Sequence, residues 1–142
     1  MIVEKTRTLR RLAPADRRLA YAALALLAAV RIALWILSFQ VVTRLVQILS
    51  VRNPVPRAST PGQVTWAVRL ASRYLPRTTC LPEALTIQIL LSWHGHMSRL
   101  HIGVALAQKF EAHAWVECDG SVVIGGAERL GRFTPILTVN AR

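Results

Sequence analysis

Acidic residues and cysteines are scarce in this 142-residue sequence. Seven Asp and Glu stand against 18 Lys and Arg, a formal net charge of +11, and there are two cysteines. Two cysteines cannot form the disulfide framework of a small secreted protein, so a reducing cytosol is the expected compartment. Zinc spacing, a glycine-rich loop and basic segments interleaved with aromatics are all lacking, so nucleic acid is not an expected partner.

The positive charge is concentrated in the N-terminal part of the chain. Residues 1–60 hold ten of the basic residues and two of the acidic ones, whereas residues 61–142 hold eight and five. An acidic peptide, a partner protein or an anionic membrane surface would each suit this charge. The length is that of one domain with an extension.

The most apolar stretch runs from Leu19 to Phe39, with Arg31 inside it. A charge near the centre of a membrane span is costly, and no small-residue cleavage site follows a short apolar core as in a signal peptide. The Ala and Leu content favours a helix packed on the protein or at an interface, with membrane insertion as the alternative. A second amphipathic helix is expected from Val41 to Leu49.

Prolines at high density divide the chain between residues 53 and 61. We therefore expect a basic, apolar helical extension at residues 1–58, which would dock on a partner or a membrane surface, and a second domain at residues 59–142. Thr60 is a candidate N-cap with Pro61 at the first helical position.

Thr79 is the candidate cap of the next helix, which would place Cys80 in its first turn and end near Gly95. Beyond this point the apolar period changes from helical to alternating. Strands are expected at residues 100–107, 112–118 and 121–124, and Asp119-Gly120 predicts a hairpin turn between the last two. Helices followed by an antiparallel sheet predict an α+β fold.

Cys80 and His113 form the most informative pattern in the sequence. A cysteine at a helix N-terminus has its thiolate stabilised by the helix dipole, and a nearby imidazolium stabilises it further. Such a pair attacks carbonyl groups, and the histidine returns the proton to the leaving amine. The alternative is that Cys80 is a small buried hydrophobe and His113 a core histidine. The chain would then be a basic protein that binds a membrane surface or nucleic acid.

Two sequence segments carry a family resemblance: Thr79-Cys80-Leu81-Pro82-Glu83-Ala84-Leu85, and Ala112-His113-Ala114-Trp115-Val116-Glu117 followed by Gly120. Together they resemble the B protein of lasso peptide biosynthesis, over roughly residues 61–130. The resemblance implies a papain-like or transglutaminase-like fold that removes the leader from a ribosomally made precursor peptide. It implies Cys80 as the nucleophile and His113 as the general base.

The same resemblance implies partners. The precursor peptide would be the substrate, and an asparagine-synthetase-like cyclase would close the macrolactam after cleavage. Residues 1–58 show no strand hairpin typical of a fused leader-recognition domain, so a separate leader-recognition protein is expected. No cofactor is implied.

The third catalytic residue departs from the family pattern. The family has an aspartate about a dozen residues after the histidine, where this chain has Gly125-Gly126. Glu117 shares a strand face with His113, but two strand residues span about 7 Å, which is long for a direct bond. Asp119 suits the turn, and Glu128 could fold back. These three carboxylates remain candidates, and a Cys–His dyad is the alternative. The missing aspartate also leaves open a non-catalytic interaction subunit with a transglutaminase-like body.

A regular hairpin would place Trp115 opposite Ile124 and His113 opposite Gly126. Trp115 would then fill core or line the cleft. Cys118 falls on the strand face away from His113, where a structural role is expected.

Three further histidines, His94, His96 and His101, invite comparison with a metal site. No carboxylates lie near the His-x-His pair in the sequence, so no metal is expected.

Overall fold

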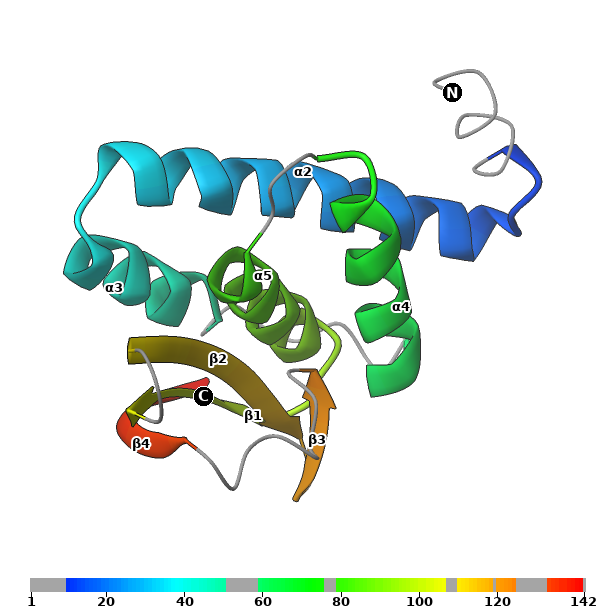
Figure 1. Cartoon of the computed structure of the whole chain (residues 1–142). Helices are drawn as coiled ribbons and strands as arrows, with labels where there is room; N and C mark the ends of the chain where they lie inside the picture. The colour runs from blue at the N-terminus through cyan, green and yellow to red at the C-terminus, as the bar shows by residue number, and fades with distance from the viewer. Residues whose placement is uncertain are drawn as a thin grey trace.

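A computed structural model of the protein describes residues 10–50, 59–75, 79–106, 110–118, 120–124 and 133–141. Within these residues, four helices precede and flank a four-stranded antiparallel sheet, so the predicted α+β class is confirmed (Figure 1). The helices are α2 (Pro14–Ile36), α3 (Phe39–Ser50), α4 (Pro61–Ser72) and α5 (Cys80–Trp93). The strands are β1 (Ser98–Leu106), β2 (Phe110–Cys118), β3 (Ser121–Ile124) and β4 (Thr134–Ala141).

The sheet has the strand order β3-β2-β1-β4. Its β4 strand was not predicted from the sequence. Pro135 argues against a strand because proline cannot donate to the hydrogen-bond ladder, but β4 pairs only with β1 in this order, and proline is tolerated on an edge strand.

The β2–β3 hairpin departs from the regular register expected from the sequence. Cys118 pairs with Ser121, as a two-residue turn requires, and Gly120 adopts a positive φ of 80°. An irregularity then lies between Val116 and Glu117, so that Val116 and not Trp115 pairs with Ile124. The expected pairing of Trp115 with Ile124 is wrong, because a bulge inserts one residue and displaces everything beyond it. The expected pairing of His113 with Gly126 lies outside the described residues.

The α5 helix is the centre of the core. Every residue from Ala84 to Ser92 is buried, so the helix is covered on all sides and not along one stripe. One face of the sheet packs on it through alternate residues, among them Leu100, Ala114 and Val116. Gln88 links the two layers, since its Nε2 donates a hydrogen bond to the carbonyl of Val139 at 2.7 Å.

The α2 helix belongs to the same hydrophobic core. Its buried side chains, including Ala23, Leu27 and Val30, cluster with those of α4 and α5. The rest of α2 is less covered: 28 % of its most apolar window is buried, and by length and composition the helix could cross a membrane. The boundary predicted near residue 58 lies outside the described residues.

The N-terminus of α4 follows a local sequence rule. Thr60 accepts a hydrogen bond from the Gln63 backbone N–H, and the Gln63 side chain accepts one from the Thr60 N–H. This capping box, with Pro61 at the first position, confirms the predicted start of α4. Such a cap contributes about 1 kcal/mol of helix stability.

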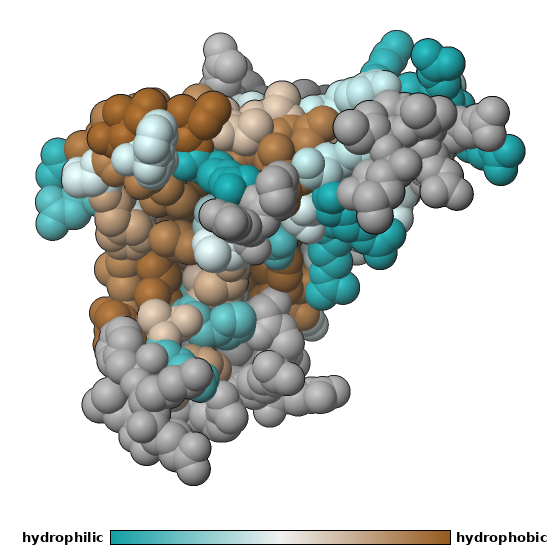
Figure 2. Space-filling model, turned by 45° about the horizontal axis from the view of Figure 1, so that its top comes forward, coloured by the Kyte–Doolittle hydropathy of each residue, from teal (hydrophilic) through white to brown (hydrophobic). Residues whose placement is uncertain are grey.

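Apolar surface gathers at the end of the molecule where α2 meets α3 (Figure 2). Ile32, Trp35 and Ile36 of α2 are exposed there, and Ile48 extends the exposed apolar surface along α3. This end of the helical layer lies away from the N-terminal end of α2.

Candidate active site

Cys80 is the first residue of α5, as predicted, and is half-buried against the edge of the core. Thr79 is the N-cap in an extended conformation, but its side chain makes no capping hydrogen bond. The backbone N–H groups of a first helical turn have no partner within the helix. They therefore provide a partial positive charge beside the thiol and donors for a developing oxyanion.

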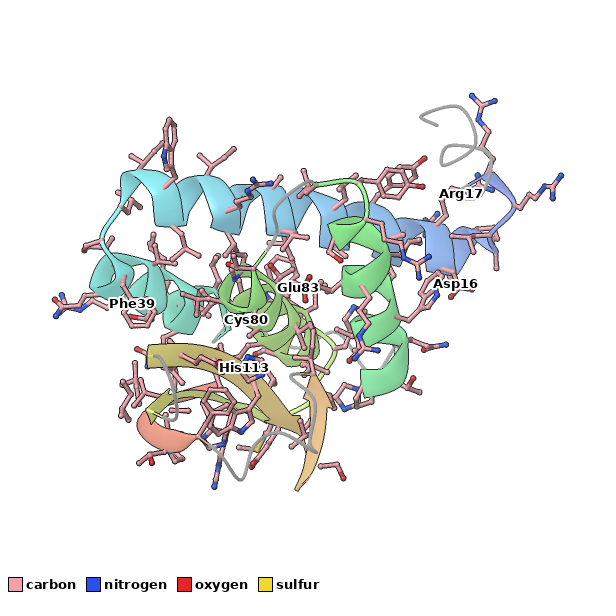
Figure 3. The ribbon with its side chains drawn as sticks, in the orientation of Figure 1. Asp16, Arg17, Phe39, Cys80, Glu83 and His113 are labelled. Atoms are coloured by element: carbon pink, nitrogen blue, oxygen red, sulfur yellow. The ribbon has the colours of Figure 1, made fainter. Side chains whose placement is uncertain are left out.

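His113 lies in β2 at the sheet end nearest the start of α5. The chain runs down α5 and returns along β1 in the opposite sense, and α5 packs on both β1 and β2. A helix of 14 residues extends about 20 Å, the distance that about six strand residues cover. Six residues forward from Ser98 along β1 is Val104, which pairs with Ala112 beside His113. Figure 3 shows Cys80 on α5 and His113 on the strand below it.

The imidazole of His113 shares the sheet face of Trp115 and not the face that packs on α5. Its ring centroid is 6.3 Å from that of Trp115 and 5.2 Å from that of Phe133. Ala114, the next residue, points to the core instead. The structure therefore places His113 level with the start of α5 but facing an aromatic layer on the opposite side of the sheet, so its pairing with Cys80 stays a prediction.

The Trp115 ring forms the floor of this aromatic layer. It is buried, and it stacks on His101 with a centroid distance of 5.4 Å. Gly103 leaves room for it, since a Cβ there would lie 2.8 Å from the Trp115 ring. We call His101, Trp115, His113 and Phe133 the imidazole–aromatic layer.

Glu117 points to His101 in this structure. Its Oε2 lies 3.3 Å from Nε2 of His101, an ion-pair distance without good hydrogen-bond geometry. The other ring nitrogen of His101, Nδ1, lies 3.0 Å from Oγ1 of Thr138 on β4. His101 is thus held between two strands, and the role of Glu117 in orienting His113 stays a prediction.

The remaining candidates have simple outcomes. Cys118 is buried in the core, on the face opposite His113. Asp119, Glu128 and Gly125-Gly126 lie outside the described residues, and their predicted roles stay predictions.

Glu83 is a polar residue of the site that the sequence reasoning quoted but gave no role. It lies three residues after Cys80, so the two side chains share one side of α5. Burial raises the pKa of its carboxyl above the usual 4.5, while a hydrogen bond with Ser72 and the charge of Arg69 act in the opposite direction. The spacing of three residues between Cys80 and Glu83 was the signal in the sequence that could have identified Glu83 as a neighbour of Cys80.

His94 and His96 lie at the far end of α5. Nε2 of His96 lies 2.7 Å from the carbonyl oxygen of Ser59. Burial lowers the pKa of His94, and the neighbouring His96 lowers it further. Within the described ranges, no three His, Cys, Asp or Glu side chains are grouped so that they could hold a metal ion.

A sequence model of the transglutaminase-like superfamily matches residues 23–138. The chain belongs to the transglutaminase-like superfamily. The match begins inside α2 and ends inside β4, so it includes the Cys80 helix, the strands β1, β2 and β3, and the first part of β4. Neither the curated proteins nor the solved structures that were compared include a match to this chain.

Membership of this superfamily agrees with the architecture. A cysteine at the start of a central helix and a histidine on an adjoining antiparallel sheet are typical of a cysteine-peptidase-like fold. The assignment to this superfamily confirms the coarser part of the sequence interpretation.

Proposed function

We propose that this transglutaminase-like protein is a cysteine peptidase that removes the leader from a lasso precursor peptide. Cleavage would precede macrolactam closure by an asparagine-synthetase-like cyclase, and a separate protein would recognise the leader. Cys80 is the nucleophile and His113 the general base, as the resemblance implies. The observation that carries the proposal is the place of Cys80, at the N-terminus of the helix at the centre of the fold.

The chemistry follows from that place. The helix dipole favours the thiolate form of Cys80, which attacks the carbonyl carbon of the scissile peptide bond. First-turn N–H groups donate to the oxygen as it becomes an oxyanion, and an imidazolium delivers a proton to the leaving amine. Water then hydrolyses the thioester and releases the leader.

His113 must meet the thiol for this mechanism to operate. In the structure its ring packs on Trp115 and Phe133, on the sheet face away from α5, so a rearrangement of the β2 backbone at this end of the sheet is part of the proposal. Catalytic geometries commonly tighten only when substrate is bound.

The packing of His113 also favours a second candidate function. If the imidazole–aromatic layer is permanent, the protein is a non-catalytic subunit that uses a transglutaminase-like body to bind the precursor or the cyclase. Cys80 would then be a structural residue at the edge of the core.

Thiol reactivity and cleavage separate the two candidates. A catalytic Cys80 alkylates with iodoacetamide near neutral pH faster than Cys118, which is buried. Precursor cleavage, assayed by mass spectrometry with the leader-recognition protein present, is abolished by Cys80→Ala and His113→Ala and retained by Cys118→Ala. Full cleavage by Cys80→Ala would end the peptidase proposal and leave the binding role.

A further inference from the structure

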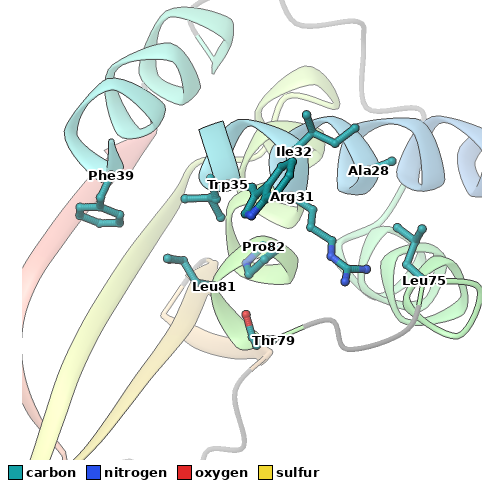
Figure 4. A pocket seen from close by; sticks show the side chains of 10 residues that line it. Ala28, Arg31, Ile32, Trp35, Phe39, Leu75, Thr79, Leu81 and Pro82 are labelled. Carbon is teal, nitrogen blue, oxygen red and sulfur yellow. The ribbon is translucent and has the colours of Figure 1, made fainter. Parts of the chain in front are cut away.

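A groove of about 720 Å³ opens beside the first turn of α5 (Figure 4). It lies between the second half of α2, the start of α3 and the residues next to Cys80. Ten residues of the described part of the chain line it; eight of these are apolar, and the other two are Thr79 and Arg31. A cavity of this size and composition is typical of a site that binds an organic ligand or a peptide side chain.

The groove adjoins the proposed nucleophile. Thr79 precedes Cys80 in the sequence, and Leu81 and Pro82 follow it, and all three line the groove. A peptide whose scissile carbonyl is held at Cys80 therefore has its neighbouring side chains within reach of the groove. Apolar residues from α2 and α3 form the opposite wall.

That opposite wall carries apolar surface open to solvent. Trp35 has 87 % of its surface exposed and Ile32 has 56 %. Figure 4 shows both on α2, with Leu81 and Pro82 of α5 across from them. Removing such surface from water favours a bulky apolar side chain as occupant.

Among the described residues that line the groove, the charge is positive. Arg31 is the charged residue among the lining residues, and Figure 4 shows its side chain extending toward Leu75. No Asp or Glu occurs in the sequence between Asp16 and Glu83. A carboxylate on the occupant would meet a guanidinium without competition from an acidic residue of this segment.

We infer that this groove binds the peptide substrate through a bulky apolar side chain that lies next to an acidic residue. The apolar side chain packs between Trp35 and Leu81, and the carboxylate pairs with Arg31. The inference rests on the proposed function, since it takes Cys80 as the point of cleavage, and it adds the class of sequence that the site selects.

The experiment uses the full chain with Cys80→Ala, so that binding is measured without cleavage. Trp35 is the most exposed of the four tryptophans, so a peptide that covers it changes the fluorescence and its quenching by iodide. The probes are synthetic peptides with Phe next to Asp, Phe next to Asn, and Ala next to Asp. We expect the first to protect Trp35 and to bind on the order of tenfold tighter than either of the others.

A charge exchange identifies the partner of the carboxylate. Arg31→Glu is expected to weaken binding of the Phe–Asp peptide and to prefer a Phe–Lys peptide, whereas the matched control Arg44→Glu, on the exposed side of α3, is expected to change neither. Circular dichroism checks that both variants fold. The peptide substitutions test the same contact without altering the protein.

Each outcome bears on one proposal. If the three peptides bind equally, or if Arg31→Glu binds the Phe–Asp peptide as before, the groove is not the substrate site. If anionic phospholipid vesicles protect Trp35 and the peptides do not, this surface is a membrane contact and the inference is overturned. If cleavage requires Cys80 but is unchanged by Arg31→Glu, the groove inference is wrong and the peptidase proposal stands. If the peptides bind selectively but cleavage does not require Cys80, the peptidase proposal is wrong and the groove inference stands as a binding site.

Discussion

The Glu117 carboxylate lies 3.3 Å from Nε2 of His101, across the β1–β2 ladder. Their strands pair so that His101 is opposite Trp115 and Arg99 is opposite Glu117, which makes the contact a diagonal one. Diagonal neighbours on one sheet face are within reach of long side chains. The Glu117 carboxylate and the His101 imidazole, on the sheet face away from α5, therefore contact each other.

This contact makes a prediction about catalysis. If the Glu117 carboxylate interacts with His101 and not with His113, then Glu117→Gln and His101→Gln lower the turnover of precursor cleavage by the same small factor. The double variant then costs no more than either single change, because both remove one interaction. A loss in Glu117→Gln well beyond that in His101→Gln would instead assign Glu117 to the orientation of His113.

Glu83 predicts an unusual dependence of stability on pH. Its pKa is raised in the folded protein, chiefly by burial, so folding favours the protonated carboxyl. The stability that this group contributes is full below the unfolded-state pKa and is lost as pH rises through the folded-state value. We expect Glu83→Gln to raise the melting temperature at about pH 7 and to make no difference at about pH 3.5. Thermal unfolding followed by circular dichroism checks this, and a lower melting temperature at neutral pH would show that the contacts with Arg69 and Ser72 outweigh burial.

For His94 we expect the opposite dependence of protein stability on pH. Its pKa is lowered by burial and by His96, so the folded protein favours the neutral ring. The stability from this group is present above its ordinary pKa of 6.5 and is lost as pH falls through the folded-state value. We expect His94→Asn to flatten the loss of stability on acidification between about pH 7 and about pH 5, measured by urea unfolding. An unchanged slope would place the acid sensitivity in another group.

The α2 helix predicts the result of a truncation. A chain that begins at Thr60 loses the α2 side chains that cluster with α4 and α5, and it exposes the buried faces of both helices. Each large core side chain lost costs about 2–5 kcal/mol, and several are removed together. We expect the shortened protein to lose cooperative thermal unfolding and to bind a hydrophobic dye. A folded, cooperative product with a reactive Cys80 would instead make residues 1–58 a separate docking extension.

Local patterns were enough to predict most of the elements. The Thr60 cap, the start of α5 at Cys80, the end of that helix near Gly95 and the turn at Gly120 all depend on backbone preferences within a few residues. The helix-then-sheet order predicted the α+β class for the same reason. The edge strand β4 was missed because the presence of Pro135 in a strand is acceptable only where a neighbouring strand is absent on one side, and that is a property of the whole sheet.

The candidate site was predictable in its residues but not in its contacts. Cys80 at a helix start and His113 in a strand follow from the sequence by itself, because caps and alternation are short-range. The partner of Glu117, the bulge that moves Ile124 opposite Val116, and the aromatic surroundings of His113 were decided by tertiary structure. Each depends on strand register and on which sheet face α5 covers. The strand register and the covered sheet face are set by burial of apolar area between segments far apart in the chain. Local backbone preferences do not encode either of them.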